Sequence, residues 1–215
     1  MEVSHKKLRK RRARFTISLL VVVSIFGLVG YASQPATETT DDSVLSSQTD
    51  NELASTVLDR LEIKGRAPKS GYARDEFGSG WASVDGCDMR NILLQRSLEQ
   101  IALSEDGCTV LSGVLDDPYT SETIIFTRGR TTSDDVQIDH VVALSDAWQK
   151  GAQNLDFSER VVFANDPLNL LAVSGPANQQ KGDSDAASWL PLNKNYRCQY
   201  VARQIAVKES YALGA

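Results

Sequence analysis

Two stretches of this 215-residue sequence decide its fold: VQIDHVVALSDAW at 136–148 and DPLNLLAVSGPANQQKGD at 166–183. Each contains a short run rich in Val, Ile and Leu, a pattern typical of a buried strand. We therefore predict strands over 136–139 and 168–173. Pro176 follows the second strand, where a helix can begin, because proline suits the first turn of a helix.

Outside these stretches the sequence predicts a mixture of helices and strands. Helical spacing of apolar residues, with capping residues at some starts, predicts helices over 52–63, 89–103, 144–152, 157–164 and 193–213. Runs of β-branched residues at 108–115 and 122–129, around the turn DDPYT, predict a small β-hairpin. Since the elements lack the regular strand–helix–strand order of parallel sheets, the predicted fold class is α+β.

Residues 1–32 have the pattern of an export signal. Seven Lys and Arg fall within the first fourteen positions, and an uninterrupted apolar stretch follows at 15–30. That stretch is short for a membrane span but suits a signal peptide, with cleavage expected after Ala32. An uncleaved N-terminal membrane anchor is the alternative, and both place the remainder outside the cytoplasm. Residues 33–52 are rich in Ser, Thr and Asp and predict a disordered linker, which leaves 53–215 as the folded domain.

The charge balance limits how the domain could bind nucleic acid. From Ser33 onward the chain has 16 Lys and Arg against 27 Asp and Glu, a net charge of −11. This balance argues against a protein that holds nucleic acid mainly through a basic surface. Any phosphate chemistry would need a metal ion.

Three cysteines lie in the predicted domain. Cys87 and Cys108 could close a loop of about 20 residues in an exported protein, a crosslink that stabilises by about 3 kcal/mol. Cys198 is then left as a free thiol, an intermolecular bridge or a sign of another pairing. No pair has the CxxC spacing of a zinc site.

His140 is the only histidine after the predicted export signal. One histidine excludes zinc sites with two or three imidazoles, and the chain has no GxSxG turn of a serine hydrolase. His140 follows Asp139 at the end of a predicted strand, so the two side chains point apart unless the chain bends.

Further polar residues follow downstream. Asn169 and Asn178 supply neutral oxygens, and Lys181 supplies one cation. The oxygens of an aspartate and an asparagine are hard ligands suited to Mg²⁺, an ion that keeps several waters and uses few protein ligands.

The strings IDHVVALS, PLNLLAV and NQQK, with Asn178 nine positions after Asn169, resemble the ββα-metal motif of HNH endonucleases. Over about 88–208 the chain more closely resembles exported bacterial HNH proteins related to the C-terminal domain of GmrSD-type restriction enzymes. The resemblance implies an α+β fold with a ββα-metal (His-Me finger) core, additional helices and a small hairpin. It also implies a metal-dependent endonuclease that cleaves DNA, with RNA as a further candidate substrate, and with little sequence specificity.

The resemblance assigns roles residue by residue. His140 would be the general base that activates water, and Asp139 and Asn178 would hold one divalent cation. Asn169 would brace the loop that bears His140, and Lys181 would contact phosphate. Many relatives place a second histidine at the position of Asn178, and this departure favours Mg²⁺, or Mn²⁺, over ions that prefer imidazole.

Two other functions remain open at this stage. The domain could be a non-catalytic secreted or envelope-associated binding module that keeps the HNH fold, or a metal-independent hydrolase. Asparagines near turns and helix starts also serve as caps, and an exposed lysine is usually solvated. Trp81, Trp148 and Trp189 are expected in the core, with base stacking as the alternative. A monomer is expected.

Overall fold

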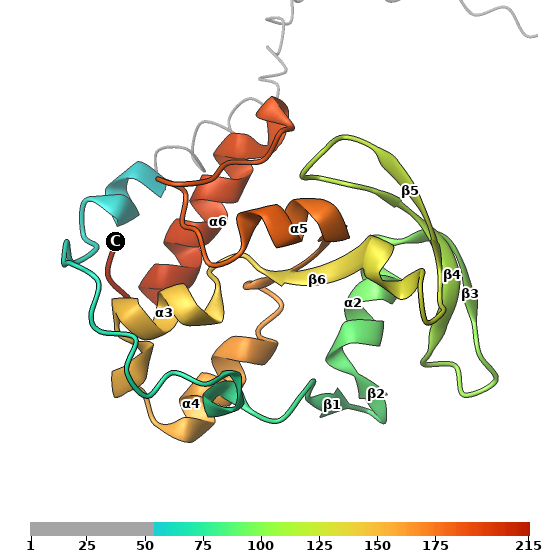
Figure 1. The fold of residues 1–215 in the computed structure, drawn as a ribbon, viewed down its shortest axis with the longest axis horizontal. Helices are drawn as coiled ribbons and strands as arrows, with labels where there is room; N and C mark the ends of the chain where they lie inside the picture. Colours follow the sequence, from blue (N-terminus) through green and yellow to red (C-terminus); the bar gives the residue numbers. More distant parts are fainter. Residues whose placement is uncertain (1–53) are drawn as a thin grey trace, which may run out of the picture. The chain divides into compact units, whose positions relative to one another are not determined.

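The computed structural model describes residues 54–215 (Figure 1). The predicted export signal, 1–32, and the predicted linker, 33–52, lie outside the described residues. Across 54–215, no helix combines the length and the apolar character that a membrane span requires.

Helices and short antiparallel sheets share the described chain, as the α+β class predicts. The α-helices that follow a helical stretch at 54–58 are α2 (Met89–Ser97), α3 (Leu144–Lys150), α4 (Phe157–Asn165), α5 (Gly175–Lys181) and α6 (Arg197–Ser210). The strands are β1 (Ser83–Val84), β2 (Cys87–Asp88), β3 (Glu99–Leu103), β4 (Val110–Asp116), β5 (Thr123–Thr127), β6 (Val136–His140) and β7 (Leu170–Ser174). Within 54–215 the strands form three sheets: β1–β2, β3–β4–β5 and β6–β7.

Strands β6 and β7 and helix α5 form one unit, and α3 and α4 are inserted between the two strands. The strands pair antiparallel, with His140 opposite Leu170 and Val136 opposite Ser174. Helix α5 begins directly after β7 and lies along β6 (Figure 1). A Cβ atom at Gly175 would lie 1.8 Å from the Asp134 carbonyl oxygen, so only glycine fits at this junction.

The predicted hairpin is present, but one predicted helix is too long. Strands β4 and β5 pair antiparallel as expected. The helix predicted over 89–103 ends at Ser97, and the chain from Glu99 to Leu103 is instead the edge strand β3, paired with β4. Leu98 has extended backbone angles and Gln100 has a positive φ of 50°. Pairing with the free edge of the hairpin overrides the local helical pattern.

The two terminal helices are also shorter than predicted. At 52–63 the described helical stretch covers only 54–58. The helix predicted over 193–213 begins as a 3-10 turn (Lys194–Tyr196) and continues as α6. The intervening helices α3 and α4 occur where they were predicted.

Three clusters of buried apolar side chains meet around the end of β6. The first packs α2 against the sheets and includes Ile138. The second joins α3, α4 and α6 and includes Val142. The third contains Val141 with Tyr119 and Tyr200. Because neighbouring residues enter different clusters, the backbone at the end of β6 is held from three sides.

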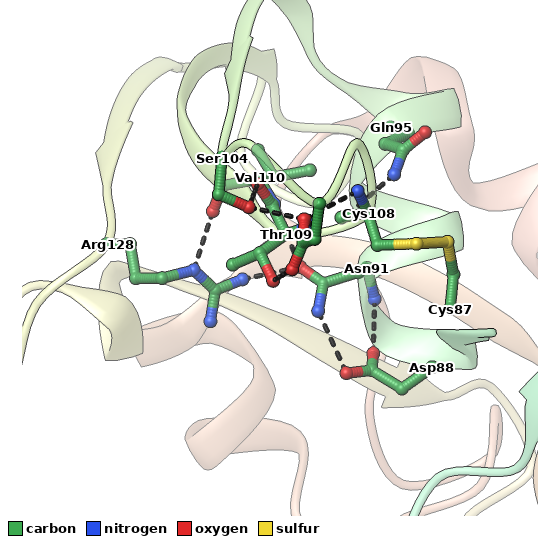
Figure 2. The surroundings of a disulfide bond; sticks show 10 residues. Cys87, Asp88, Asn91, Gln95, Ser104, Cys108, Thr109, Val110 and Arg128 are labelled. Carbon is green, nitrogen blue, oxygen red and sulfur yellow. Dashed lines mark hydrogen bonds between the residues drawn. A yellow bond between two sulfur atoms is a disulfide. The ribbon is translucent and has the colours of Figure 1, made fainter.

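Cys87 and Cys108 form a disulfide that ties the start of α2 to the turn before β4 (Figure 2). Beside it, the Asn91 amide oxygen accepts hydrogen bonds from the Val110 backbone at 3.0 Å and from the Arg128 guanidinium at 2.6 Å. Cys198 is an exposed free thiol on α6. The cysteine count left the disulfide pairing open, and the structure pairs Cys87 with Cys108.

Replacing both disulfide cysteines, Cys87→Ala and Cys108→Ala, should lower the free energy of unfolding by about 3 kcal/mol. The bond links residues 21 positions apart and so restricts the unfolded chain. Urea titrations followed by circular dichroism measure the change. Cys198→Ser is the matched control and should change stability by no more than about 0.5 kcal/mol. A double variant as stable as the native protein would contradict this prediction.

Candidate active site

His140 ends β6, and its imidazole is held by the last turn of α4. Its Nε2 lies 2.9 Å from the Ala164 carbonyl oxygen. A carbonyl only accepts hydrogen bonds, so we assign the proton of the neutral ring to Nε2. The lone pair is then on Nδ1, which makes that atom the one able to accept a proton.

Trp81 packs against the same imidazole. The two rings are stacked, with centroids 5.8 Å apart and planes 5° apart. The next residue, Ala82, donates its backbone N–H to the Asn165 amide oxygen at 2.8 Å. Asn165 follows Ala164 in α4, so the two supports of the His140 ring are joined to each other. This arrangement fixes the plane of the imidazole.

Burial lowers the pKa of His140 to about 4, and the positive charges of Arg74 and Lys181 contribute in the same direction. The hydrogen bond to Ala164 opposes the shift. His140 is only 7% exposed. Near pH 7 its imidazole is therefore neutral and able to act as a base.

The Asp139 side chain contacts different elements from the His140 side chain, as the alternation of side chains along a strand predicts. Its Oδ1 lies 2.9 Å from the Lys181 ammonium, and its Oδ2 accepts a hydrogen bond of 2.5 Å from the Tyr119 hydroxyl. Lys181 also donates to the His140 carbonyl oxygen at 2.9 Å. Burial raises the pKa of Asp139, while Lys181 and Tyr119 oppose this shift by stabilising the carboxylate.

Asn178 lies on α5 and faces β6. Its amide nitrogen donates to the Gln137 amide oxygen at 2.9 Å. The Asn178 amide oxygen, in contrast, accepts no hydrogen bond from any residue within 54–215. Asn178, Asp139 and His140 border a common cavity of about 330 Å³.

Asn169 is fully buried behind the site. Its amide accepts from the Val142 N–H at 2.8 Å and donates to the Val142 carbonyl at 3.2 Å. Its backbone carbonyl accepts from Val141 N–H at 2.8 Å. These contacts hold the two residues that follow His140, as a bracing residue would.

The donor set around the cavity fits a hard divalent cation. Within 54–215 no three His, Cys, Asp or Glu side chains gather as a metal cluster. Asp139 nevertheless uses only two of about four lone-pair positions on its carboxylate, and Asn178 has a free amide oxygen. One carboxylate and one amide suit Mg²⁺, which completes its coordination with water and substrate phosphates.

His140, Asp139 and Asn178 border one cavity, and Asn169 is buried behind them. Their roles as base, cation ligands and brace stay predictions. Lys181 is different, because its side chain has no exposed surface and its ammonium pairs with Asp139. This geometry gives no support to the predicted contact between Lys181 and phosphate.

Sequence reasoning missed three residues of the site. Tyr119 lies in the DPYT turn, which the sequence assigns to the hairpin and to the family signature but to no role in the site. Arg74 borders both this cavity and a second one, of about 190 Å³, that also includes His140. Trp81 was expected in the core, with base stacking as the alternative. The segment 71–81 has no periodicity that would have marked Arg74 or Trp81.

Comparisons with known proteins agree with the resemblance found in the sequence. Residues 88–214 match the family described as GmrSD restriction endonucleases, C-terminal domain. The chain is also 34% identical over 194 residues to a protein of Arthroderma benhamiae named "Uncharacterized secreted protein", with 89% of each chain covered. No solved structure matches the chain.

Removing the positive charge of Lys181 should destabilise the fold strongly. Lys181→Met leaves the Asp139 carboxylate buried without its partner, so the free energy of unfolding should fall by about 3–5 kcal/mol near pH 7. Urea unfolding measures the loss. The double variant Lys181→Met with Asp139→Asn removes both charges and should recover part of the stability. If the single variant unfolds like the native protein, the ion pair is not the anchor described above.

Acid should destabilise the metal-free protein through His140. The folded pKa of about 4 lies below the unfolded value of 6.5. The neutral imidazole therefore stabilises the fold fully above pH 6.5. This contribution to the free energy of unfolding, about 3 kcal/mol, is lost as pH falls toward 4.

Urea titrations in EDTA near pH 7 and near pH 4 measure this loss. His140→Gln can still donate to the Ala164 carbonyl but does not titrate, so it should lack this part of the pH dependence. The same pH dependence in both proteins would refute the assignment.

Proposed function

The chain belongs to the family of GmrSD restriction endonuclease C-terminal domains, and from this premise we propose that it is an HNH-type endonuclease that hydrolyses phosphodiester bonds. DNA is the proposed substrate, RNA a further candidate, and cleavage has little sequence specificity. The antiparallel pair β6–β7 followed by α5 supports the proposal that this unit is the ββα-metal core.

The observation that carries the proposal is the state of His140. Its Nε2 is committed to the Ala164 carbonyl, and its lowered pKa keeps the ring neutral. Nδ1 therefore accepts the proton of a water molecule as that water attacks phosphorus. Trp81 holds the ring plane, so little reorientation is needed when the proton moves.

Asp139 and Asn178 would hold a divalent cation, Mg²⁺ or Mn²⁺, as the family implies. When bound, that ion neutralises charge on the scissile phosphate and on the leaving oxygen. Lys181 and Tyr119 fix the orientation of the Asp139 carboxylate from its buried side. Lys181 also partly compensates the charge of Asp139, so we expect modest affinity for the ion.

We further propose that the nuclease domain, 53–215, is exported. The sequence pattern of 1–32 supports a signal peptide or membrane anchor, and 33–52 would be a flexible linker. The name of the relative from Arthroderma benhamiae, a secreted protein, is consistent with this location.

One observation favours a second candidate, a non-catalytic binding domain. The carboxylate of Asp139 already has a buried ammonium at 2.9 Å, an arrangement that could persist without any metal. In that case the protein would bind its partner through the same fold but cleave nothing.

Plasmid and single-stranded DNA incubated with Mg²⁺, Mn²⁺ or EDTA separate the two functions. We expect cleavage with either metal and none in EDTA. His140→Ala should lower the rate by about 10²–10⁴-fold, because general-base catalysis contributes that much. Asn178→Ala should raise the Mg²⁺ concentration required. The remote variant Cys198→Ser, purified in parallel, controls for contaminating nucleases and should retain full activity.

Three results would count against the proposal. If the folded protein cleaves neither DNA nor RNA with any metal, the binding-domain candidate is favoured. If His140→Ala cleaves like the native protein, His140 is not the base. If cleavage persists in EDTA, the proposed cation is not required.

A further inference from the structure

A second cavity, of about 190 Å³, also borders His140. Its apolar and aromatic lining residues are Phe77, Trp81, Leu144 and Ala164. Besides His140, its polar side chains are those of Arg74, Asp75 and Ser79. The proposed cation ligands Asp139 and Asn178 border only the first cavity. The second cavity therefore borders the proposed base without bordering either proposed cation ligand.

Arg74 lies where the two cavities meet. Among residues 54–215 it is the only Lys or Arg that borders either of them, and its side chain is exposed. It has no hydrogen-bond or ion-pair partner among the residues that the structure describes. Several other arginines are engaged: Arg160 with Glu76, for example, and Arg203 with three backbone carbonyls of 167–170. Arg96 and Arg130 also lack a partner within 54–215, but neither borders the two cavities. An unpaired guanidinium beside the base is suited to bind a phosphate oxygen.

The recessed position of His140 restricts which nucleic acids can reach it. His140 is 7% exposed, and residues 78–81 line the second cavity. In a duplex the bases stay stacked and paired, and turning one nucleotide inward costs energy. A single strand pays no such cost of unpairing and can place a base on an aromatic surface.

The charge of the described domain also favours a single-stranded substrate over a duplex. Residues 54–215 carry 16 Lys and Arg against 22 Asp and Glu. A duplex has a higher density of phosphate charge than a single strand and depends more strongly on basic contacts. Among residues 54–215, Arg74 is the one unpaired cation that borders the two cavities, so the domain is poorly equipped to hold a duplex.

We propose that the cavity lined by Phe77, Trp81 and Leu144 binds one unpaired nucleobase next to the scissile bond, with Arg74 on the adjoining phosphate. The protein then prefers single-stranded nucleic acid. This inference rests on the proposed nuclease function and adds its substrate class.

The first test uses a single-stranded oligodeoxynucleotide, the same strand in a perfect duplex, and the same strand with one abasic position. Native protein with Mg²⁺ should cleave the single strand at least about tenfold faster than the duplex. Cleavage should drop about tenfold at the bond next to the abasic position and stay unchanged elsewhere, since base–aromatic stacking of ordinary strength gives a factor of this size.

The second test measures binding without cleavage, by fluorescence anisotropy of the labelled single strand in EDTA. Arg74→Gln should weaken binding about tenfold, because a charge-assisted contact to phosphate is lost. Lys69→Gln is the matched control: Lys69 is exposed, pairs with Asp183 and borders neither cavity, so this change should weaken binding less than twofold.

The outcomes keep the two proposals separate. Cleavage of duplex and single strand at equal rates, with no effect of the abasic position, would overturn the base-binding cavity while leaving the nuclease intact. Equal weakening by Arg74→Gln and Lys69→Gln would overturn the role of Arg74. No cleavage of any probe, with the single strand still bound through Arg74, would overturn the nuclease proposal alone.

Discussion

The buried ion pair between Lys181 and Asp139 is the constraint on which the rest of this structure depends. It joins the end of α5 to the end of β6, and the same ammonium also binds the carbonyl of His140. Burying one of these charges without the other would cost several kcal/mol, so the helix and the strand are held in one register. Tyr119 adds a contact from the hairpin turn to the same carboxylate. Two neighbouring residues of one strand thereby differ in role: Asp139 anchors the fold and borders the larger cavity, and His140 borders both cavities.

The position of His140 follows from that anchor. Three apolar cores meet around the end of β6, and Asn169 fixes the two residues beyond it. The ring is then held by a carbonyl on one atom and an indole on its face. A base so rigidly held needs little reorganisation during proton transfer, and its burial keeps it neutral over a wide pH range. The same burial limits access, and this is why the cavities beside the ring bear on the choice of substrate.

The sequence predicted the elements whose signals are local. The strands ending at His140 and preceding Pro176, the hairpin around DDPYT and the disulfide partners depend on short patterns or on a cysteine count. The edge strand β3 could not be found in this way, because its pairing with β4 is a contact between segments distant in sequence. Lys181 was expected at the surface, since nothing in the sequence indicates that Asp139 lies opposite it in the interior. Arg74 and Trp81 lie in a segment without periodicity, and only the tertiary fold brings them to His140.

A crystal soaked in Mn²⁺ would show where the cation binds. We expect an anomalous scattering peak in the cavity bordered by Asp139, His140 and Asn178. Lys181 should remain buried beside Asp139 in that crystal. A crystal with no peak in this cavity at saturating Mn²⁺, or with the ion bound only at other residues, would contradict the proposed cation site and the mechanism built on it.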